Sequence, residues 1–195
     1  MTWNEPVTAL TDYLLAIVCL VCAARLWRAA RVRLRLAAAA FAAIAAGALF
    51  GGAYHAVGGA ALWKLTVYSL GLVGFFLVAA AAWPSRLLLA AAGIKLAFYS
   101  VWITSHDEFR YVIYDYGLAM VALLALSIRA GPCWRWIAAA VAVTAAGSAV
   151  QSSGFALHRH FNHNDLYHVI QMGAAWLFYR GFAAWPHAPD SASSR

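Results

Sequence analysis

The sequence predicts an all-α, polytopic membrane protein in which seven transmembrane helices form one bundle. Of its 195 residues, 65% are hydrophobic and only 11% are charged, more apolar surface than a soluble domain of this size needs. Seven apolar runs follow one another, and each approaches the roughly 20 residues that cross a bilayer as a helix. Most charged residues and histidines fall between these runs or at their ends, where water is available.

Short segments that are polar or contain glycine or proline separate the predicted spans. The spans cover residues 8–29, 36–58, 62–83, 86–104, 109–129, 133–156 and 165–185. Because they use nearly the whole chain, we expect one membrane domain over residues 1–185 and no second domain. Residues 186–195 are rich in proline, alanine and serine, and we expect them to form a disordered cytoplasmic tail.

Arginine and lysine are divided unevenly between the two ends of the predicted bundle. Arginines gather in the loops after the first, third and fifth spans and near the C-terminus, whereas the other end carries Lys64, Arg110 and Arg159. The positive-inside rule then predicts a cytoplasmic C-terminus and an external N-terminus in the cytoplasmic (inner) membrane. We attribute the formal net charge of +7 to this topology and to contacts with membrane lipids, and we expect no nucleic-acid binding.

Histidines and acids gather at the predicted extracytoplasmic end, and two of the histidines lie inside spans. His55 lies about one turn inside the end of the second span, and His168 about one turn inside the start of the seventh. Residues three and four apart are neighbours on a helix. One face of the last helix therefore carries Asn164, Asp165, His168 and Gln171. Such a face belongs inside the bundle rather than against lipid.

Two interpretations of this polar constellation stay open. Imidazoles from two helices together with a carboxylate can bind a metal ion, which here would use His55, His168 and Asp165. The same groups can instead close the end of the bundle as a hydrogen-bonded plug. Asp12, near the start of the first span, either joins this site or, like its neighbour Thr11, caps its own helix.

Lys95 and Asp115 lie too deep in their spans to reach the membrane surface easily. Lys95 is near the middle of the fourth span, and Asp115 is about two turns into the fifth. A charge at that depth costs at least about 2.5–3.5 kcal/mol on insertion scales unless it is satisfied. We therefore predict a buried ion pair between these two side chains.

Seven spans, a histidine near the end of the second and a histidine motif at the start of the seventh resemble the CREST superfamily. That group includes alkaline ceramidases and the progestin and adiponectin receptors. In it, one histidine of span 2 and two of an HxxxH motif in span 7 hold zinc. His55 and His168 match two of these positions, but Asn164 replaces the first histidine of the motif. Gly51 replaces a serine of that family, and span 3 lacks its aspartate.

The resemblance implies a zinc-dependent membrane hydrolase of a lipid amide or ester, with its site at the extracytoplasmic end. It implies His55 and His168 as zinc ligands; candidates for the third ligand are Asp165, Asp12, His106 and Asp115. Asp165, Asn164 and Asp12 are the predicted catalytic residues, and Asn164 or Gln171 would orient water or substrate.

Two further expectations follow from the resemblance and from its departures. Glu5 and Asp12 resemble a reduced form of the calcium-binding N-terminal segment of alkaline ceramidases. The replaced positions also leave a second class open, a non-enzymatic sensor, receptor or transporter-like protein. In that class the polar site binds a ligand or a proton without chemistry.

Overall fold

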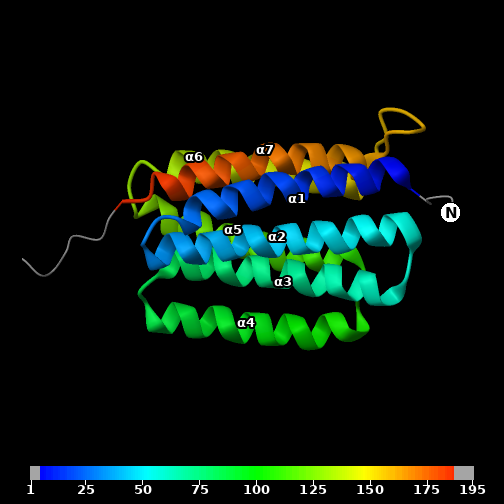
Figure 1. Cartoon of the computed structure of the whole chain (residues 1–195). Coiled ribbons are helices and arrows are strands. Elements are labelled where there is room, and N and C mark those ends of the chain that lie inside the picture. The colour runs from blue at the N-terminus through cyan, green and yellow to red at the C-terminus, as the bar shows by residue number, and fades with distance from the viewer. Residues whose placement is uncertain (1–4, 187–195) are drawn as a thin grey trace, which may run out of the picture.

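The computed structural model describes residues 5–186, and over this range it consists of seven long α-helices joined by short connections (Figure 1). The helices are α1 (Pro6–Trp27), α2 (Val32–Val57), α3 (Ala60–Ala82), α4 (Arg86–Ser105), α5 (Phe109–Ile128), α6 (Trp134–Ser153) and α7 (His163–Ala183). Each boundary agrees with the predicted span to within four residues. Apart from Pro186, the predicted tail lies outside the described residues.

Six of these helices, α1 to α6, are long and apolar enough to cross a membrane. The prediction of an all-helical chain is therefore confirmed, and six of the seven predicted spans have the length and apolar composition of a membrane helix. α7 has 21 residues and is the most polar of the seven, because its first turns carry the predicted site residues. Long helices suit lipid because each satisfies its own backbone hydrogen bonds.

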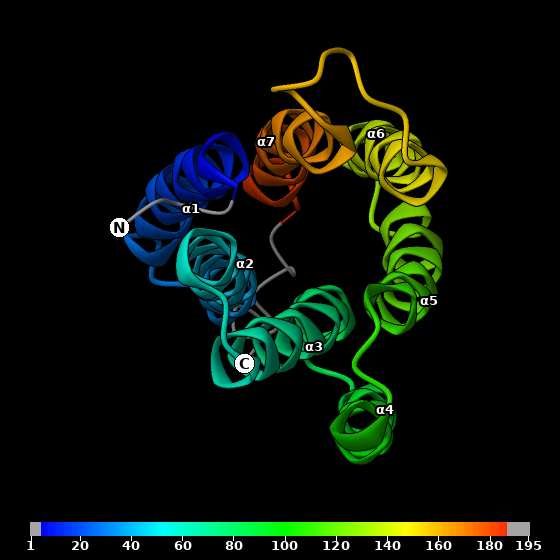
Figure 2. The same cartoon turned by 90° about the vertical axis from the view of Figure 1, so that its right-hand side faces the viewer.

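Six of the helices form a ring, and the remaining helix, α4, lies outside it. Viewed along the bundle in Figure 2, α1, α2, α3, α5, α6 and α7 surround a central space, and α4 lies outside against α3. The ring closes because α7, at the end of the chain, packs against α1 at its beginning as well as against α6. This closure places side chains of the first and last helices side by side.

Small residues allow neighbouring helices of the bundle to approach closely. A Cβ atom added at Gly52 of α2 would stand 2.7 Å from Tyr13 Cε1 of α1. At Gly71 of α3 the added atom would overlap the ring of Tyr99 on α4, and at Gly181 of α7 it would overlap Ile137 of α6. In lipid, where hydrophobic burial does not drive helix association, such close packing supplies much of the attraction.

The end of the bundle where α2, α4 and α6 begin, here called the arginine end, is closed by packing. Arg33 Nη1 donates to the carbonyls of Ala80 and Ala81 (2.9 Å each), and its Nη2 donates to the Trp83 carbonyl (2.6 Å). The guanidinium also lies 5.0 Å from the ring centroid of Trp185. Arg33 thereby satisfies the last carbonyls of α3, which have no partner within that helix.

The structure brings Lys95 and Asp115 together. Lys95 Nζ of α4 lies 2.5 Å from Asp115 Oδ1 of α5, and both side chains are largely buried. Nearby, the Tyr99 hydroxyl of α4 donates to the Val67 carbonyl of α3 (2.8 Å). These two polar contacts attach α4 to the outside of the ring. The far face of α4, which includes Leu87, is exposed and apolar, as a lipid-facing surface is.

Candidate functional site

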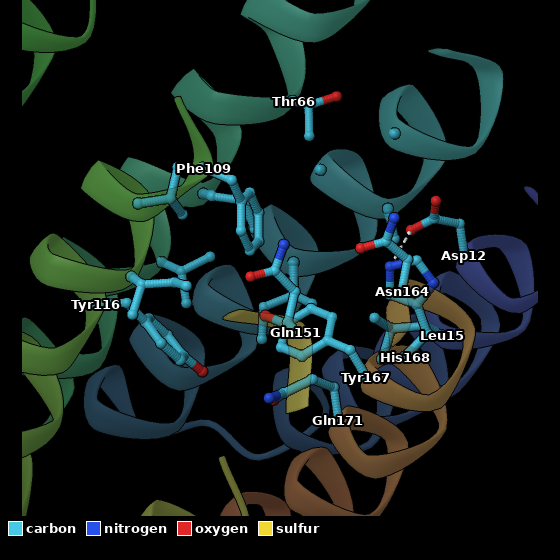
Figure 3. Close-up of a pocket in the computed structure, with 18 of the residues that line it drawn as sticks. Asp12, Leu15, Thr66, Phe109, Tyr116, Gln151, Asn164, Tyr167, His168 and Gln171 are labelled. Atoms are coloured by element: carbon cyan, nitrogen blue, oxygen red, sulfur yellow. Dashed lines mark ion pairs between the residues drawn. The ribbon is translucent and has the colours of Figure 1, made fainter. Parts of the chain in front are cut away.

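A cavity of about 240 Å³ lies inside the ring, in the half of the bundle opposite the arginine end. Figure 3 shows its lining side chains, which come from all six helices of the ring. Most of the wall is apolar or aromatic. Its polar lining residues are Asp12, His55, Thr66, Ser148, Gln151, His163, Asn164, His168 and Gln171. Among residues 5–186, neither lysine nor arginine belongs to the lining.

A buried acid and a buried imidazole contact each other across the α1–α7 seam. His168 Nε2 lies 3.2 Å from Asp12 Oδ1. The other ring nitrogen, Nδ1, lies 3.0 Å from Thr11 Oγ1, whose hydroxyl donates to the Thr8 carbonyl (3.0 Å). Both nitrogens of His168 are therefore engaged by α1, and both Asp12 and His168 are buried.

These contacts determine how many protons the pair carries. A hydroxyl has one hydrogen, and that of Thr11 is directed at Thr8, so Nδ1–H of His168 donates to Thr11. Nε2 then faces the Asp12 carboxylate, and one proton is needed between the two heavy atoms. Whichever atom carries it, Asp12 and His168 together are neutral.

Asp165 has a structural task that the metal prediction did not include. Asn162 Oδ1 accepts from the amides of Asn164 (2.8 Å) and Asp165 (3.3 Å), and Asp165 Oδ2 accepts from the Asn162 amide (2.7 Å). This reciprocal capping box starts α7. One carboxylate oxygen of Asp165, Oδ1, remains buried without a partner.

The two acids of the predicted calcium segment bind different histidines. Glu5 Oε2 lies 2.7 Å from His55 Nδ1, and the Glu5 amide donates to the His55 carbonyl (3.1 Å). Asp12 instead contacts His168. Glu5 is also the N-cap residue of α1, which begins at Pro6. The alternative in which Thr11 or Asp12 caps this helix is therefore wrong.

Two other candidates for a third zinc ligand lie away from the cavity. His106 stacks on Trp102, with ring centroids 4.0 Å apart, and Asp115 pairs with Lys95. Within residues 5–186, no three His, Cys, Asp or Glu side chains are grouped to hold one metal ion. Of the possible zinc ligands, Asp12 and His168 contact each other, but no third ligand is grouped with them in the described residues. The zinc site stays a prediction.

The sequence analysis did not predict an aromatic wall, which lines the cavity at the end away from the arginine end. Ring contacts run from Tyr54 of α2 to Trp63 of α3 (centroids 5.1 Å apart), then to Phe109 of α5 (6.3 Å) and Tyr167 of α7 (5.9 Å). Tyr167 in turn lies 5.6 Å from the His168 ring. The wall therefore joins four helices and ends at the buried acid–imidazole pair. The sequence signal for this wall was that its aromatic residues lie near span ends. Aromatic residues are common at span ends, so this position alone did not indicate a cavity.

The chain belongs to the family described as "Family of unknown function (DUF6962)", which matches residues 7–187. The match extends over nearly the whole described bundle, including every residue that lines the cavity. No curated protein and no solved structure matches the chain. The cavity and its side chains are therefore the basis for assigning a function.

Proposed function

We propose that this member of the family binds a small amphipathic molecule in its cavity, as a sensor, receptor or transporter-like protein. One observation carries the proposal: an internal cavity of about 240 Å³ joins an aromatic wall to a buried Asp12–His168 pair. Ligand sites are typically concave and mostly apolar, with a few polar groups that orient the ligand. The cavity has this composition, and its polar groups gather at one end.

We place the cavity on the extracytoplasmic side of the membrane, with seven spans and an external N-terminus. α7 supports the seventh span, because it packs between α1 and α6 and has a similar length. The arginines at the opposite end support the orientation. A reporter fused after Ala188 is expected to behave as cytoplasmic, and one fused at the N-terminus as external. The reverse result for both would refute this topology.

The engagement of His168 favours binding over catalysis. A general base needs a ring nitrogen available to substrate or water, and a metal ligand needs one directed at the ion. Both nitrogens of His168 contact α1 instead, one at Thr11 and the other at Asp12. A ligand can bind beside this pair without disturbing it. Chemistry at His168 would require one of these contacts to open.

A zinc-dependent lipid hydrolase, as the CREST resemblance implies, is the second candidate. It is favoured by one observation, which is that His55, His168 and Asp12 line the same cavity. This candidate predicts about one zinc ion per purified chain and turnover of a lipid amide or ester.

Metal analysis and a lipid-hydrolysis screen separate the two functions. The hydrolase requires that His55→Ala combined with His168→Ala removes both the zinc and the product. Purified protein without stoichiometric zinc, and without turnover that depends on His168, excludes it. A hydrolysis product that disappears with His168→Ala would refute a purely binding role.

A further inference from the structure

The polar end of the cavity has two buried acids, Asp12 and Asp165, but His168 is the one imidazole among the described residues seen to pair with them. Asp12 is the carboxylate residue among its lining side chains, and no lysine or arginine joins it there. Two of the basic side chains near this end are paired with other acids. Lys64 pairs with Asp107 (2.9 Å), and Arg110 pairs with Glu108 (3.0 Å).

Two buried carboxylate oxygens at this site receive no hydrogen bond from the part of the chain that the structure describes. They are Asp12 Oδ2 and Asp165 Oδ1, and the two residues are 4% and 1% exposed. The two acids lie close enough for their charges to interact. The proton that Asp12 shares with His168 lies at Oδ1 and leaves Oδ2 without a partner. A buried acceptor without a donor is costly, so a donor on a bound ligand would be strongly favoured here.

The cavity that Asp12 lines has a glycine next to this acid and aromatic rings elsewhere in its wall. Gly51 of α2 lines the cavity opposite Asp12, and a Cβ added to it would stand 3.4 Å from Oδ2. The absence of a side chain at Gly51 leaves a narrow gap beside Oδ2, which is itself buried, so a bound ligand has to widen this gap to reach the oxygen. Figure 3 shows Asp12 and His168 on one side of the cavity and Phe109 on the other. Aromatic faces attract cations, most strongly where water is excluded.

We infer that the ligand is an organic cation, an amine whose ammonium group binds Asp12 Oδ2 while its apolar body lies between the aromatic rings. The inference rests on the proposed ligand-binding function and specifies the chemical class of the ligand. Because Asp12 and His168 together are neutral, the Asp165 carboxylate leaves this site with one uncompensated negative charge. An ammonium supplies both the donor that Asp12 Oδ2 lacks and the compensating positive charge. A hydroxyl supplies only the donor, and a carboxylate would face Asp12 with like charge.

Three small probes with the same ring test the inference. Benzylammonium, benzyl alcohol and benzoate share an apolar body and differ in the charge of the head group. Binding to the full-length protein in lipid nanodiscs is measured by saturation-transfer NMR with titration. We expect benzylammonium to bind at least about tenfold more tightly than the other two, as charge-assisted hydrogen bonds are stronger than neutral ones. We expect Asp12→Asn to remove that preference.

Matched variants keep the test decisive if Asp12→Asn does not fold. Gly51→Ala places a methyl group against Asp12 Oδ2 and should also weaken benzylammonium selectively. Gly173→Ala is its control, because an added Cβ there meets nothing within 4 Å. Glu108→Gln removes an exposed acid that does not line the cavity and should leave binding unchanged.

The outcomes separate failure of this inference from failure of the proposed function. Equal binding of all three probes, lost when Ser148→Phe fills the cavity, would refute the cationic ligand but retain the ligand-binding function. A benzylammonium preference that survives both Asp12→Asn and Gly51→Ala would also refute the role of Asp12. Binding of none of the probes would overturn both proposals.

Discussion

The pair of Lys95 and Asp115 gives the most direct test of how charge is stabilised inside this bundle. Lys95 Nζ lies 2.5 Å from Asp115 Oδ1, and the two side chains are 19% and 8% exposed. A Cβ added to Gly74 of α3 would stand 3.0 Å from both Lys95 Nζ and Asp115 Oδ2. The ion pair therefore lies where α3, α4 and α5 meet.

Removing one partner of a buried pair leaves the other charge without compensation. We expect Lys95→Met and Asp115→Asn each to lower the free energy of unfolding by about 3–5 kcal/mol. The double substitution removes both charges and should recover much of that loss. The exposed pair of Lys64 and Asp107, at 2.9 Å with side chains 33% and 40% exposed, is the control. Breaking it should cost at most about 1 kcal/mol.

Equilibrium unfolding of the purified protein in one detergent, followed by helical circular dichroism, measures all of these variants. The double-mutant cycle then isolates the interaction between the two side chains. Strictly additive losses would show that Lys95 and Asp115 do not stabilise each other. Equal losses for the buried and the exposed pair would show that burial does not set the magnitude.

Two further substitutions test local packing and capping. Gly52→Ala places a methyl group 2.7 Å from Tyr13 Cε1, so we expect it to push α1 from α2 and cost about 1–3 kcal/mol in thermal unfolding. Gly173→Ala has open space and should be neutral or slightly stabilising; equal effects at the two glycines would contradict the packing argument. Asn162→Ala removes the cap of α7 and should cost about 1 kcal/mol, and an unchanged melting temperature would argue against that cap.

Helix positions could be predicted from this sequence because lipid permits few structures. A chain that crosses hydrocarbon must satisfy its backbone internally, so long apolar runs become helices that end where polar residues begin. The proximity of Lys95 and Asp115 could be expected for the same reason, since each needs a partner at its depth. The arrangement of six helices in a ring with α4 outside could not be predicted, because hydropathy does not specify which helices are neighbours.

The candidate site was harder to predict because each polar residue has several ways to be satisfied. The contact of Asp12 with His168 depends on α1 packing against α7, which no local pattern encodes. Asp165 was assigned to a metal, although Asn162-x-x-Asp165 is itself a capping-box signal before a helix. Glu5 was assigned to calcium, but an acid just outside the membrane is equally satisfied by a nearby imidazole, here that of His55.

The two halves of the bundle differ in a way that bears on the proposed binding function. Towards the arginine end, Phe41, Phe178 and Phe182 are almost completely buried in one apolar core with Leu77 and Ile137. The cavity therefore ends inside the bundle, and solute bound there has no open path towards the arginine end. Transport would require these rings to separate, whereas a receptor needs no path through the bundle. Because interiors are close-packed, separating them would be costly. Between the proposed classes, the packing thus favours a sensor or receptor over a transporter.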